Sequence, residues 1–307
     1  MKAIALQKYG QDLELVDRPE PKVAPGEVLI RVKAAGVNPV DWKVGEGYLD
    51  PIMEVRFPMI PGWDVAGVVE QVGLDVEAFA PGDEVYGYIR KDWVQQGSYA
   101  ELAAAHVRML ARKPSSLSWE EAAGLPLAGL TAYQSIKRVG VNAGDTVLVH
   151  AAAGGVGMCA VQIAAALGAR VIGTASERNH DFVRSLGAEP VTYGDGLADR
   201  IREVAPDGVD VALDFVGGDA VEVSRQVLKS PERLASVVDA AAAETGGHYV
   251  WVQPDSVGLT ALAELADQGR LSVTVARTLP LAEAAEAWRL SREGHTRGKL
   301  VLTVGER

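Results

Sequence analysis

A glycine-rich turn between a predicted strand and a predicted helix is the segment whose residue types point most directly to chemistry. Residues 146–150 form a short apolar strand, and a helix is expected over 156–167. Between them, Ala152, Gly154 and Gly157 have the spacing of a dinucleotide-binding turn, with alanine in place of its first glycine. Such a turn lets the backbone approach a pyrophosphate at a helix N-terminus. The alternative is that these glycines serve helix–sheet packing alone.

The end of the next predicted strand, 170–174, bears on the choice of dinucleotide. NAD-binding folds carry an acid about 20 residues after the turn, where it bonds the ribose hydroxyl. Here the strand is followed by small neutral residues up to Ser176, and then by Glu177 and Arg178. A neutral strand end leaves room for a 2′-phosphate, with which Arg178 can form a charge-assisted pair. This favours NADP, unless Glu177 takes the ribose position. The structural alternative is that Ser176 caps the next helix and Arg178 is solvated.

The sequence around the turn predicts two architectures. Residues 27–34 alternate apolar and polar side chains as a half-buried strand does, and 65–72 fits a second strand. From Ser118, which forms a predicted capping box with Glu121, short apolar strands alternate with helices. That alternation implies a parallel sheet with both faces covered.

After Gly269 the pattern returns to that of the first part. A strand is expected over 271–276, an amphipathic helix over 281–291 and a last strand over 299–304. The expected division is therefore 1–117 and 270–307 on one side and 118–269 on the other.

Composition excludes several classes of protein. The 307 residues carry 30 Lys and Arg against 41 Asp and Glu, a net charge of −11, so nucleic acid and membrane surfaces are not expected partners. The single Cys159 excludes an intrachain disulfide and a multi-cysteine zinc site. No export signal or bilayer-length apolar run is apparent, so a cytoplasmic location is expected.

Motifs along nearly the whole chain resemble one known family. They lie at 34–41 (AAGVNPVD), 60–69 (IPGWDVAGVV), 79–87 (FAPGDEVYG), 97–101 (GSYAE), 125–133 (LPLAGLTAY), 151–157 and 298–302 (GKLVL). Together they resemble the zinc-independent quinone oxidoreductases, the zeta-crystallin-like branch of the medium-chain dehydrogenase/reductase superfamily.

The resemblance implies an α/β subunit of two domains. A GroES-like, β-rich catalytic domain would comprise 1–117 and 270–307, and a Rossmann domain with a doubly wound parallel sheet would be inserted at 118–269. Substrate and nicotinamide would meet between the two domains. The family also suggests a homodimer, by analogy alone.

The resemblance further implies that zinc is absent. Zinc-dependent relatives have an early cysteine and a His-Glu pair, where this chain has Asn38 and the pair Trp63-Asp64, and the four-cysteine lobe is missing. Cys159 fits a small buried apolar residue. His106, His180, His248 and His295 share no ligand-like spacing, and His150 lies at a strand end beside the cofactor turn. Without zinc, alcohol oxidation lacks a Lewis acid for the alkoxide. This argues against an alcohol dehydrogenase.

The expected reaction is hydride transfer from NADPH to a small conjugated acceptor, a quinone, because conjugation delocalises the developing charge onto oxygen without a metal. The first alternative is an enoyl or enone (C=C) reductase with the same hydride geometry. The alternative of another class is a non-catalytic, crystallin-like NADPH-binding protein.

The resemblance implies catalytic roles for three residues. Asn38 and Asp41 would line the nicotinamide end, with Asn38 orienting the substrate, and Tyr48 would stack on the acceptor or donate its phenol proton. The structural alternatives are that Asn38-Pro39 is a turn-forming pair and that Asp41 is a surface carboxylate.

It also implies a set of cofactor-binding residues. Thr131 would lie near the nicotinamide and pyrophosphate, Ala152, Gly154, Gly155, Val156 and Gly157 would surround the phosphates, Ser176, Arg178 and Tyr193 the 2′-phosphate, and Phe215 and Val216 the path between adenosine and nicotinamide. Where the family usually shows a lysine for the 2′-phosphate, this chain has Arg178. The stretch 239–248 departs most from the family and carries no predicted site.

Overall fold

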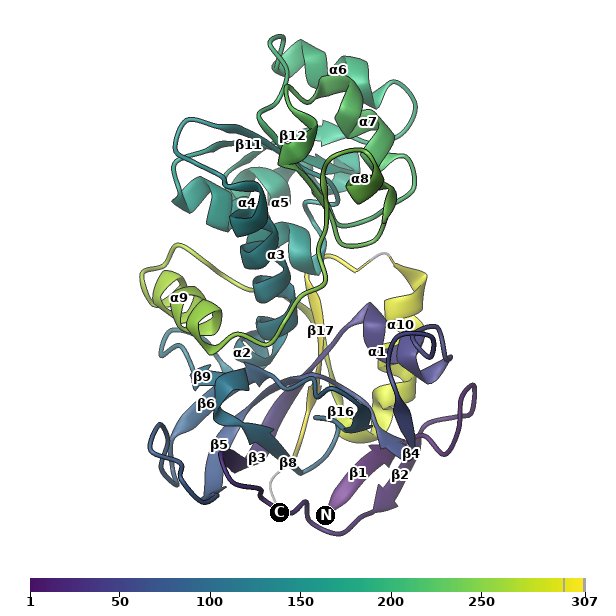
Figure 1. Ribbon diagram of the computed structural model, residues 1–307, viewed down its shortest axis with the longest axis vertical. Coiled ribbons are helices and arrows are strands. Elements are labelled where there is room, and N and C mark those ends of the chain that lie inside the picture. The colour runs from purple at the N-terminus through teal and green to yellow at the C-terminus, as the bar shows by residue number, and fades with distance from the viewer. Residues whose placement is uncertain (295, 306–307) are drawn as a thin grey trace. The chain divides into compact units, whose positions relative to one another are not determined.

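Two large sheets organise the computed structural model, which describes residues 1–294 and 296–305 (Figure 1). The β-rich unit comprises Met1–Leu127, Pro254–Gly269 and the described residues from Val273 onward, and the parallel-sheet unit comprises Ala128–Gln253 and Arg270–Ser272. His295, Glu306 and Arg307, which fall within the predicted 270–307 segment, lie outside the described residues.

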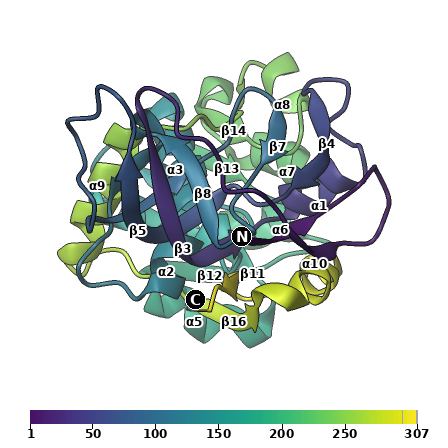
Figure 2. The ribbon, with the colours of Figure 1, turned by 90° about the horizontal axis from the view of Figure 1, so that it is seen from below.

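The main sheet of the β-rich unit has the order β16-β17-β3-β5-β6-β9, and β8 also pairs with β3. Its strands are β3 (Glu27–Val37), β5 (Asp64–Val72), β6 (Glu84–Tyr88), β8 (Leu102–His106), β9 (Leu110–Arg112), β16 (Val275–Pro280) and β17 (Lys299–Thr303). Figure 2 shows β3 between β5 and β8, with which it pairs antiparallel. The C-terminal β17 pairs antiparallel with the end of β3, Leu300 opposite Val37. Lys299 is thereby brought next to the end of β3.

Shorter elements complete the β-rich unit. They are β1 (Lys2–Ala5), β2 (Glu14–Asp17), β4 (Val55–Ile60), β7 (Val94–Gln96), α1 (Pro39–Gly45), α2 (Trp119–Gly124), α9 (Ser256–Asp267) and α10 (Ala284–Glu293). Helices α1 and α10 lie side by side (Figures 1 and 2). Helix α2 packs on β3 because Gly36 has no side chain; a Cβ there would lie 2.3 Å from the carbonyl oxygen of Ala123. The core is apolar and includes Ile30, Val65 and Leu302.

The second sheet is entirely parallel and has the order β12-β11-β10-β13-β14-β15. Its strands are β10 (Thr146–Val149), β11 (Arg170–Ala175), β12 (Ala188–Thr192), β13 (Val211–Asp214), β14 (Leu234–Ser236) and β15 (His248–Tyr249). Its helices are α3 (Pro126–Val139), which begins at the unit boundary, α4 (Gly155–Ala166), α5 (His180–Ser185), α6 (Leu197–Val204), α7 (Ala220–Val227) and α8 (Ala241–Glu244). This strand order is that of doubly wound dinucleotide-binding folds, so the predicted parallel sheet and Rossmann architecture are confirmed.

The structure divides the units at different residues from the predicted 117/118 and 269/270. The predicted capping box is present, since Ser118 and Glu121 bond each other's backbone N–H groups, but it starts α2, which packs on β3. At the other boundary, the Tyr86 hydroxyl donates to the carbonyl of Leu259 over 2.6 Å. This bond holds α9 in the β-rich unit. A capping box marks the start of a helix and does not show which sheet the helix covers.

Two elements are shifted along the chain. The strand expected over 271–276 is found as β16, because Ser272 instead exchanges hydrogen bonds with Gln162 of α4 in the parallel-sheet unit. The helix expected from Arg178 begins as a 3₁₀ turn, Glu177–Asn179, before α5. Among the described residues, none of the helices combines the length and apolar character needed to span a bilayer.

Candidate active site

The glycine-rich turn joins β10 directly to α4, as predicted. A Cβ placed on Gly157 would lie only 2.1 Å from the carbonyl oxygen of Ala151, so the helix can approach the strand this closely only with glycine at that position. Ala151 itself has a φ of 56°, which makes the turn tight. Three successive residues, Gly155, Val156 and Gly157, place their N–H groups in the first turn of α4, where a helix has no internal acceptors. The turn therefore has the features that a pyrophosphate requires.

The turn lies at the point where the strand order reverses. Strand β10 pairs with β11 on one side and with β13 on the other, and ligands of open parallel sheets bind beyond the carboxyl ends of the strands at such a point. The loop after β13 carries the predicted Phe215, half-buried, and Val216, exposed. Both the predicted phosphate turn and this loop thus come from the strand ends that flank the switch point.

Asp214, which the sequence analysis missed, shapes the loop after β13. Its Oδ1 accepts the backbone N–H groups of Val216 (2.9 Å) and Gly217 (2.8 Å), and its Oδ2 accepts the Ser236 hydroxyl at 2.6 Å. The side chain is fully buried. An acid that ends an otherwise apolar strand is the signal in the sequence that indicates such a role.

The predicted 2′-phosphate residues follow the ends of two neighbouring strands. Ala175 of β11 is paired with Thr192 of β12, so Ser176 and Tyr193 each come one residue after paired positions. Arg178 is exposed, and no ion pair of its guanidinium is found within the described part of the chain. Tyr193 is 60% exposed. A cation and a phenol are thereby available at this edge of the sheet.

Arg200 of α6 holds the loop that contains Tyr193. Its guanidinium donates to the carbonyls of Thr192 (2.9 Å), Gly194 (2.9 Å) and Asp195 (2.7 Å). Three bonds from one rigid fork fix the path of this loop. The remaining predicted cofactor residues, Thr131 and Ala152, are buried in the same unit, Thr131 on α3 and Ala152 in the turn.

Asn38 and Asp41 lie together at the junction of β3 and α1. Pro39 is the first residue of α1, and Asp41 accepts the backbone N–H of Asn38 at 2.8 Å, as an acid in the first turn of a helix does. Each of the two side chains is only 2% exposed. Asn38-Pro39 therefore starts a helix rather than a turn, and the alternative that Asp41 is a surface carboxylate is wrong.

A buried hydrogen-bond network extends from Asn38 in two directions. The ammonium of Lys299 donates to Asn38 Oδ1 and, over 3.2 Å, to the carbonyl of Val37. The Nδ2 of Asn38 donates to Asp64 Oδ2 at 2.9 Å, and Asp64 Oδ1 accepts the Leu127 N–H at 2.8 Å. Lys299 and Asp64 are 4% and 0% exposed, so this network is shielded from water.

Tyr99 completes the set that we call the Asn38 cluster: Asn38, Asp41, Asp64, Tyr99 and Lys299. The Tyr99 hydroxyl donates to Asp41 Oδ2 at 2.9 Å, whereas Asp41 Oδ1 has no hydrogen-bond partner among the described residues. Burial raises the pKa of Asp41 to about 7, against the bonds from Asn38 and Tyr99 that lower it. Burial also raises the pKa of Asp64 to about 6, with the charge of Lys299 opposing the shift.

The third predicted catalytic residue is exposed, unlike the members of this cluster. Tyr48 follows α1 and is 66% exposed, with its ring 6.3 Å from that of Trp42. Conversely, Asp64, Tyr99 and Lys299 are not among the site residues predicted from the sequence. The available signal was a lysine within the apolar strand 299–303 and an acid directly before the apolar run 65–69.

The donor chemistry of the Asn38 cluster does not fit zinc. The position of the family's metal-binding histidine is occupied by Trp63, whose ring packs 6.0 Å from that of Tyr88. Both oxygens of Asp64 already accept hydrogen bonds, and the ammonium of Lys299 would repel a second cation. Across residues 1–294 and 296–305, no three His, Cys, Asp or Glu side chains are grouped so as to hold a metal ion. Cys159 is buried within α4, and His295 is outside the described residues.

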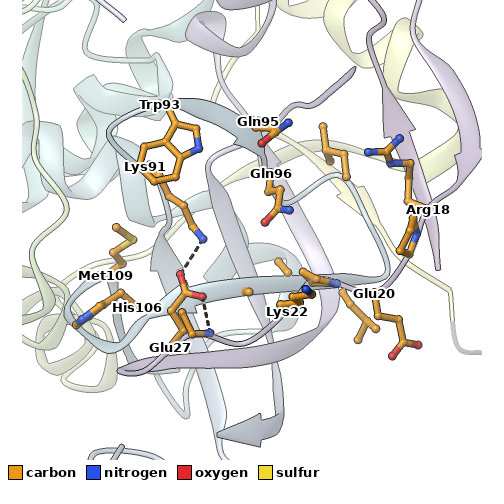
Figure 3. Close-up of a pocket in the computed structure, with 18 of the residues that line it drawn as sticks. Arg18, Glu20, Lys22, Glu27, Lys91, Trp93, Gln95, Gln96, His106 and Met109 are labelled. Atoms are coloured by element: carbon orange, nitrogen blue, oxygen red, sulfur yellow. Dashed lines mark hydrogen bonds and ion pairs between the residues drawn. The ribbon is translucent and has the colours of Figure 1, made fainter. Parts of the chain in front are cut away.

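A cavity of about 580 Å³ opens elsewhere in the β-rich unit (Figure 3). Arg18, Lys22, Trp93 and His106 are among its lining residues, and none of the predicted site residues lines it. Figure 3 shows Lys91 directed toward Glu27, with which it forms a 2.8 Å ion pair. The cavity is therefore separate from the Asn38 cluster.

Comparison with known proteins agrees with this architecture. A family model described as alcohol dehydrogenase GroES-like domain matches residues 24–115, and one described as zinc-binding dehydrogenase matches 186–302. The chain is 30% identical to a chloroplast envelope quinone oxidoreductase homolog of Arabidopsis thaliana, over 98% of each chain. It is 33% identical to the human mitochondrial NAD(P)H oxidoreductase RTN4IP1, over 91% of this chain and 82% of that protein. The structure of a quinone oxidoreductase from Coxiella burnetii, 34% identical, superposes with a TM-score of 0.86 over 99% of both chains.

These similarities define the class of protein. The chain belongs to the medium-chain dehydrogenase/reductase superfamily, among its quinone oxidoreductases. It is an oxidoreductase that uses a nicotinamide cofactor, as the resemblance in the sequence implied.

Proposed function

We propose that the chain is a zinc-independent, NADPH-dependent reductase that transfers hydride to a quinone. The observation that carries this proposal is the Asn38 cluster, in which the ammonium of Lys299 is buried beside Asn38 and its charge acts on Asp64. A conjugated acceptor needs no Lewis acid, because its developing negative charge is delocalised onto oxygen. The names of the relatives from Arabidopsis and Coxiella support a quinone as that acceptor.

The parallel-sheet unit would bind the cofactor, which supplies the hydride. The N–H groups at the start of α4 bind the diphosphate, and glycine at 157 allows the helix to come close enough to the strand. Arg178 pairs with the 2′-phosphate, beside Ser176 and Tyr193, and the neutral strand end avoids repulsion of that phosphate. The choice of NADPH over NADH rests on these residues.

The Asn38 cluster would act on the acceptor. The Asn38 amide donates a hydrogen bond to the carbonyl oxygen, which stabilises the charge that develops as hydride arrives. A hydride from the bound cofactor and a proton from solvent would together convert the quinone to its hydroquinone. Asp41, with a pKa raised to about 7 by burial, remains partly protonated at neutral pH. The protonated form of Asp41 carries no negative charge that would repel the acceptor oxygen as it becomes negative.

The test follows NADPH consumption by its absorbance. The acceptors are 1,4-benzoquinone, 9,10-phenanthrenequinone, an enone and a blank without acceptor, with NADPH binding measured by fluorescence in parallel. We expect oxidation of NADPH with the quinones and none in the blank. Faster turnover with the enone would assign the C=C reductase instead. Tight NADPH binding without oxidation by any acceptor would assign the non-catalytic, crystallin-like role.

Three further assignments stay predictions. Tyr48 is proposed to stack on the flat acceptor, for which its exposed ring is available. The homodimer rests on analogy with the family. A cytoplasmic location rests on the sequence alone, and the two relatives named above include a chloroplast envelope protein and a mitochondrial protein.

A further inference from the structure

The two partners of the Asn38 side chain differ in what they can accept and donate. A lysine ammonium only donates hydrogen bonds, and an ionised carboxylate only accepts them. The Oδ1 of Asn38 faces the ammonium of Lys299, and its Nδ2 faces Asp64 Oδ2 at 2.9 Å. Turning the amide by half a rotation would place N–H against ammonium and oxygen against carboxylate. Both contacts would then be repulsive, so a single amide orientation is stable.

The backbone of Lys299 is held in place by strand pairing and by packing on a helix. It is the first residue of β17, whose next residue, Leu300, is paired with Val37, directly before Asn38. The stem of Lys299 packs against α2, since a Cβ on Gly124 would lie 3.3 Å from the Cβ of Lys299. The sheet and the helix together thus fix the ammonium beside Asn38.

We propose that Lys299 is a positioning residue that fixes the Asn38 amide so that it acts as a hydrogen-bond donor toward the substrate. The amide oxygen is taken by Lys299 and one N–H by Asp64, and a primary amide has a second N–H to offer. The ligand class that follows is one with a carbonyl oxygen, such as a quinone or an enone. The inference rests on the proposed function, because it assigns the atom of Asn38 that meets the acceptor.

A merely neutralising role for Lys299 makes a different prediction. If Lys299 serves only to balance the charge of Asp64, removing both charges together restores the activity that is lost when Lys299 alone is replaced. Lys299→Met combined with Asp64→Asn removes one positive and one negative charge. The new amide at 64 still accepts the Leu127 N–H with its oxygen, so its NH₂ group faces Asn38 and favours the turned orientation. Positioning therefore predicts no recovery in the double variant, and neutralisation predicts recovery.

The experiment compares the wild-type enzyme with Lys299→Met, Lys299→Gln and the double variant. Lys113→Met is the matched control, because the Lys113 side chain is also only 7% exposed and donates to two backbone carbonyls, those of Pro114 and Leu117. The measurements are kcat and KM for 1,4-benzoquinone, the Kd of NADPH by fluorescence, the melting temperature, and the side-chain amide NMR signal of Asn38, assigned by its loss in Asn38→Asp.

We expect Lys299→Met to lower kcat with quinone roughly 10- to 100-fold, the usual effect of losing a charge-assisted hydrogen bond, with the Kd of NADPH within about twofold. The Asn38 amide signal should shift in this variant and not in Lys113→Met. Lys299→Gln, which retains a donor for Asn38 Oδ1, should recover part of kcat and serves where Lys299→Met fails to fold.

Two results would overturn the positioning role. One is recovery of kcat in the double variant, and the other is an unchanged Asn38 amide signal in Lys299→Met or Lys299→Gln. Failure of the proposed function is a separate outcome, seen as a wild-type protein that reduces no acceptor. In that case the amide signal alone decides whether Lys299 orients Asn38.

Discussion

Asp41 and Tyr99 form a buried pair in which the phenol donates a 2.9 Å hydrogen bond to a carboxylate oxygen. The pair joins α1 to the segment just before β8, and water reaches neither side chain. Burial raises the pKa of Asp41 from 3.8 to about 7. The pKa of Tyr99 is raised well above 10.0, mainly by burial and secondly by the negative charge of Asp41. A carboxyl group that prefers its neutral form in the folded state makes stability depend on pH.

The pH dependence has a definite sign. Between the unfolded pKa of 3.8 and the folded pKa of about 7, the folded chain holds a proton at Asp41 that the unfolded chain has released. The resulting contribution to the stability of the folded state is present in full below pH 3.8 and is lost as the pH rises toward 7. We expect Asp41→Asn, which is neutral at every pH, to raise the melting temperature relative to wild type more at pH 8 than at pH 5. Exposed Asp92→Asn is the control. If the melting temperatures of wild type and Asp41→Asn change with pH in parallel, the raised pKa of Asp41 is contradicted.

Much of the fold was predictable because its signals are local. The turn at 151–157 and the apolar strands that follow it define a doubly wound sheet through chain-local patterns of apolar and small residues. The unit boundaries were not predictable in this way. Whether α9 covers one sheet or the other depends on contacts such as that of Tyr86 with Leu259, which are 173 residues apart.

The candidate site was predictable only where its residues follow one another in the chain. Asn38 and Asp41 are three residues apart at a strand–helix junction, and the family motif includes both. Lys299 reaches Asn38 from 261 residues away, through a strand pairing that the sequence does not reveal. A lysine next to an apolar run usually lies at an exposed strand end, so its burial beside two carboxylates became visible only in three dimensions.

Gly157→Ala tests the close approach of α4 to the turn. The added methyl group would lie 2.1 Å from the Ala151 carbonyl oxygen, so the helix must move away. We expect a loss of stability of about 1–3 kcal/mol, typical of overpacking, and at least tenfold weaker NADPH binding. Gly154→Ala in the same turn is the comparison, because its Cβ would meet that oxygen at 3.3 Å and cost much less stability. Equal changes in melting temperature for Gly157→Ala and Gly154→Ala would show that the close approach of α4 to the turn does not require glycine at 157.

Arg200→Met tests whether the Tyr193 loop must be held for cofactor binding. The substitution removes three hydrogen bonds to backbone carbonyls and keeps an unbranched side chain. We expect the Kd of NADPH to rise about three- to tenfold with kcat unchanged, because the loop must then be ordered on binding. Arg202→Met on the same helix is the control, since Arg202 contacts Asp199 and Gln226. Similar effects of Arg200→Met and Arg202→Met on the Kd of NADPH would show that Arg200 only stabilises helix α6.

Removal of metal tests the proposed zinc independence. The protein is dialysed against a strong chelator and then assayed with NADPH and 1,4-benzoquinone, with and without added zinc. We expect unchanged kcat, because Lys299 already supplies the positive charge at the Asn38 cluster. Activity lost on dialysis and restored by zinc would refute this.

Cofactor preference is tested at the two neighbouring charges that follow β11. Arg178 is exposed without an ion pair in the described residues, so its replacement by alanine removes the proposed phosphate ligand and breaks no ion pair. We expect Arg178→Ala to raise the KM for NADPH about 10- to 100-fold and to leave that for NADH within about twofold. Glu177→Ala tests the alternative that Glu177 bonds the ribose hydroxyl. If it does, this variant binds NADH more weakly than the wild type. If Arg178→Ala raises both KM values equally, the guanidinium does not contact the 2′-phosphate, and NADPH preference must arise elsewhere at the strand ends.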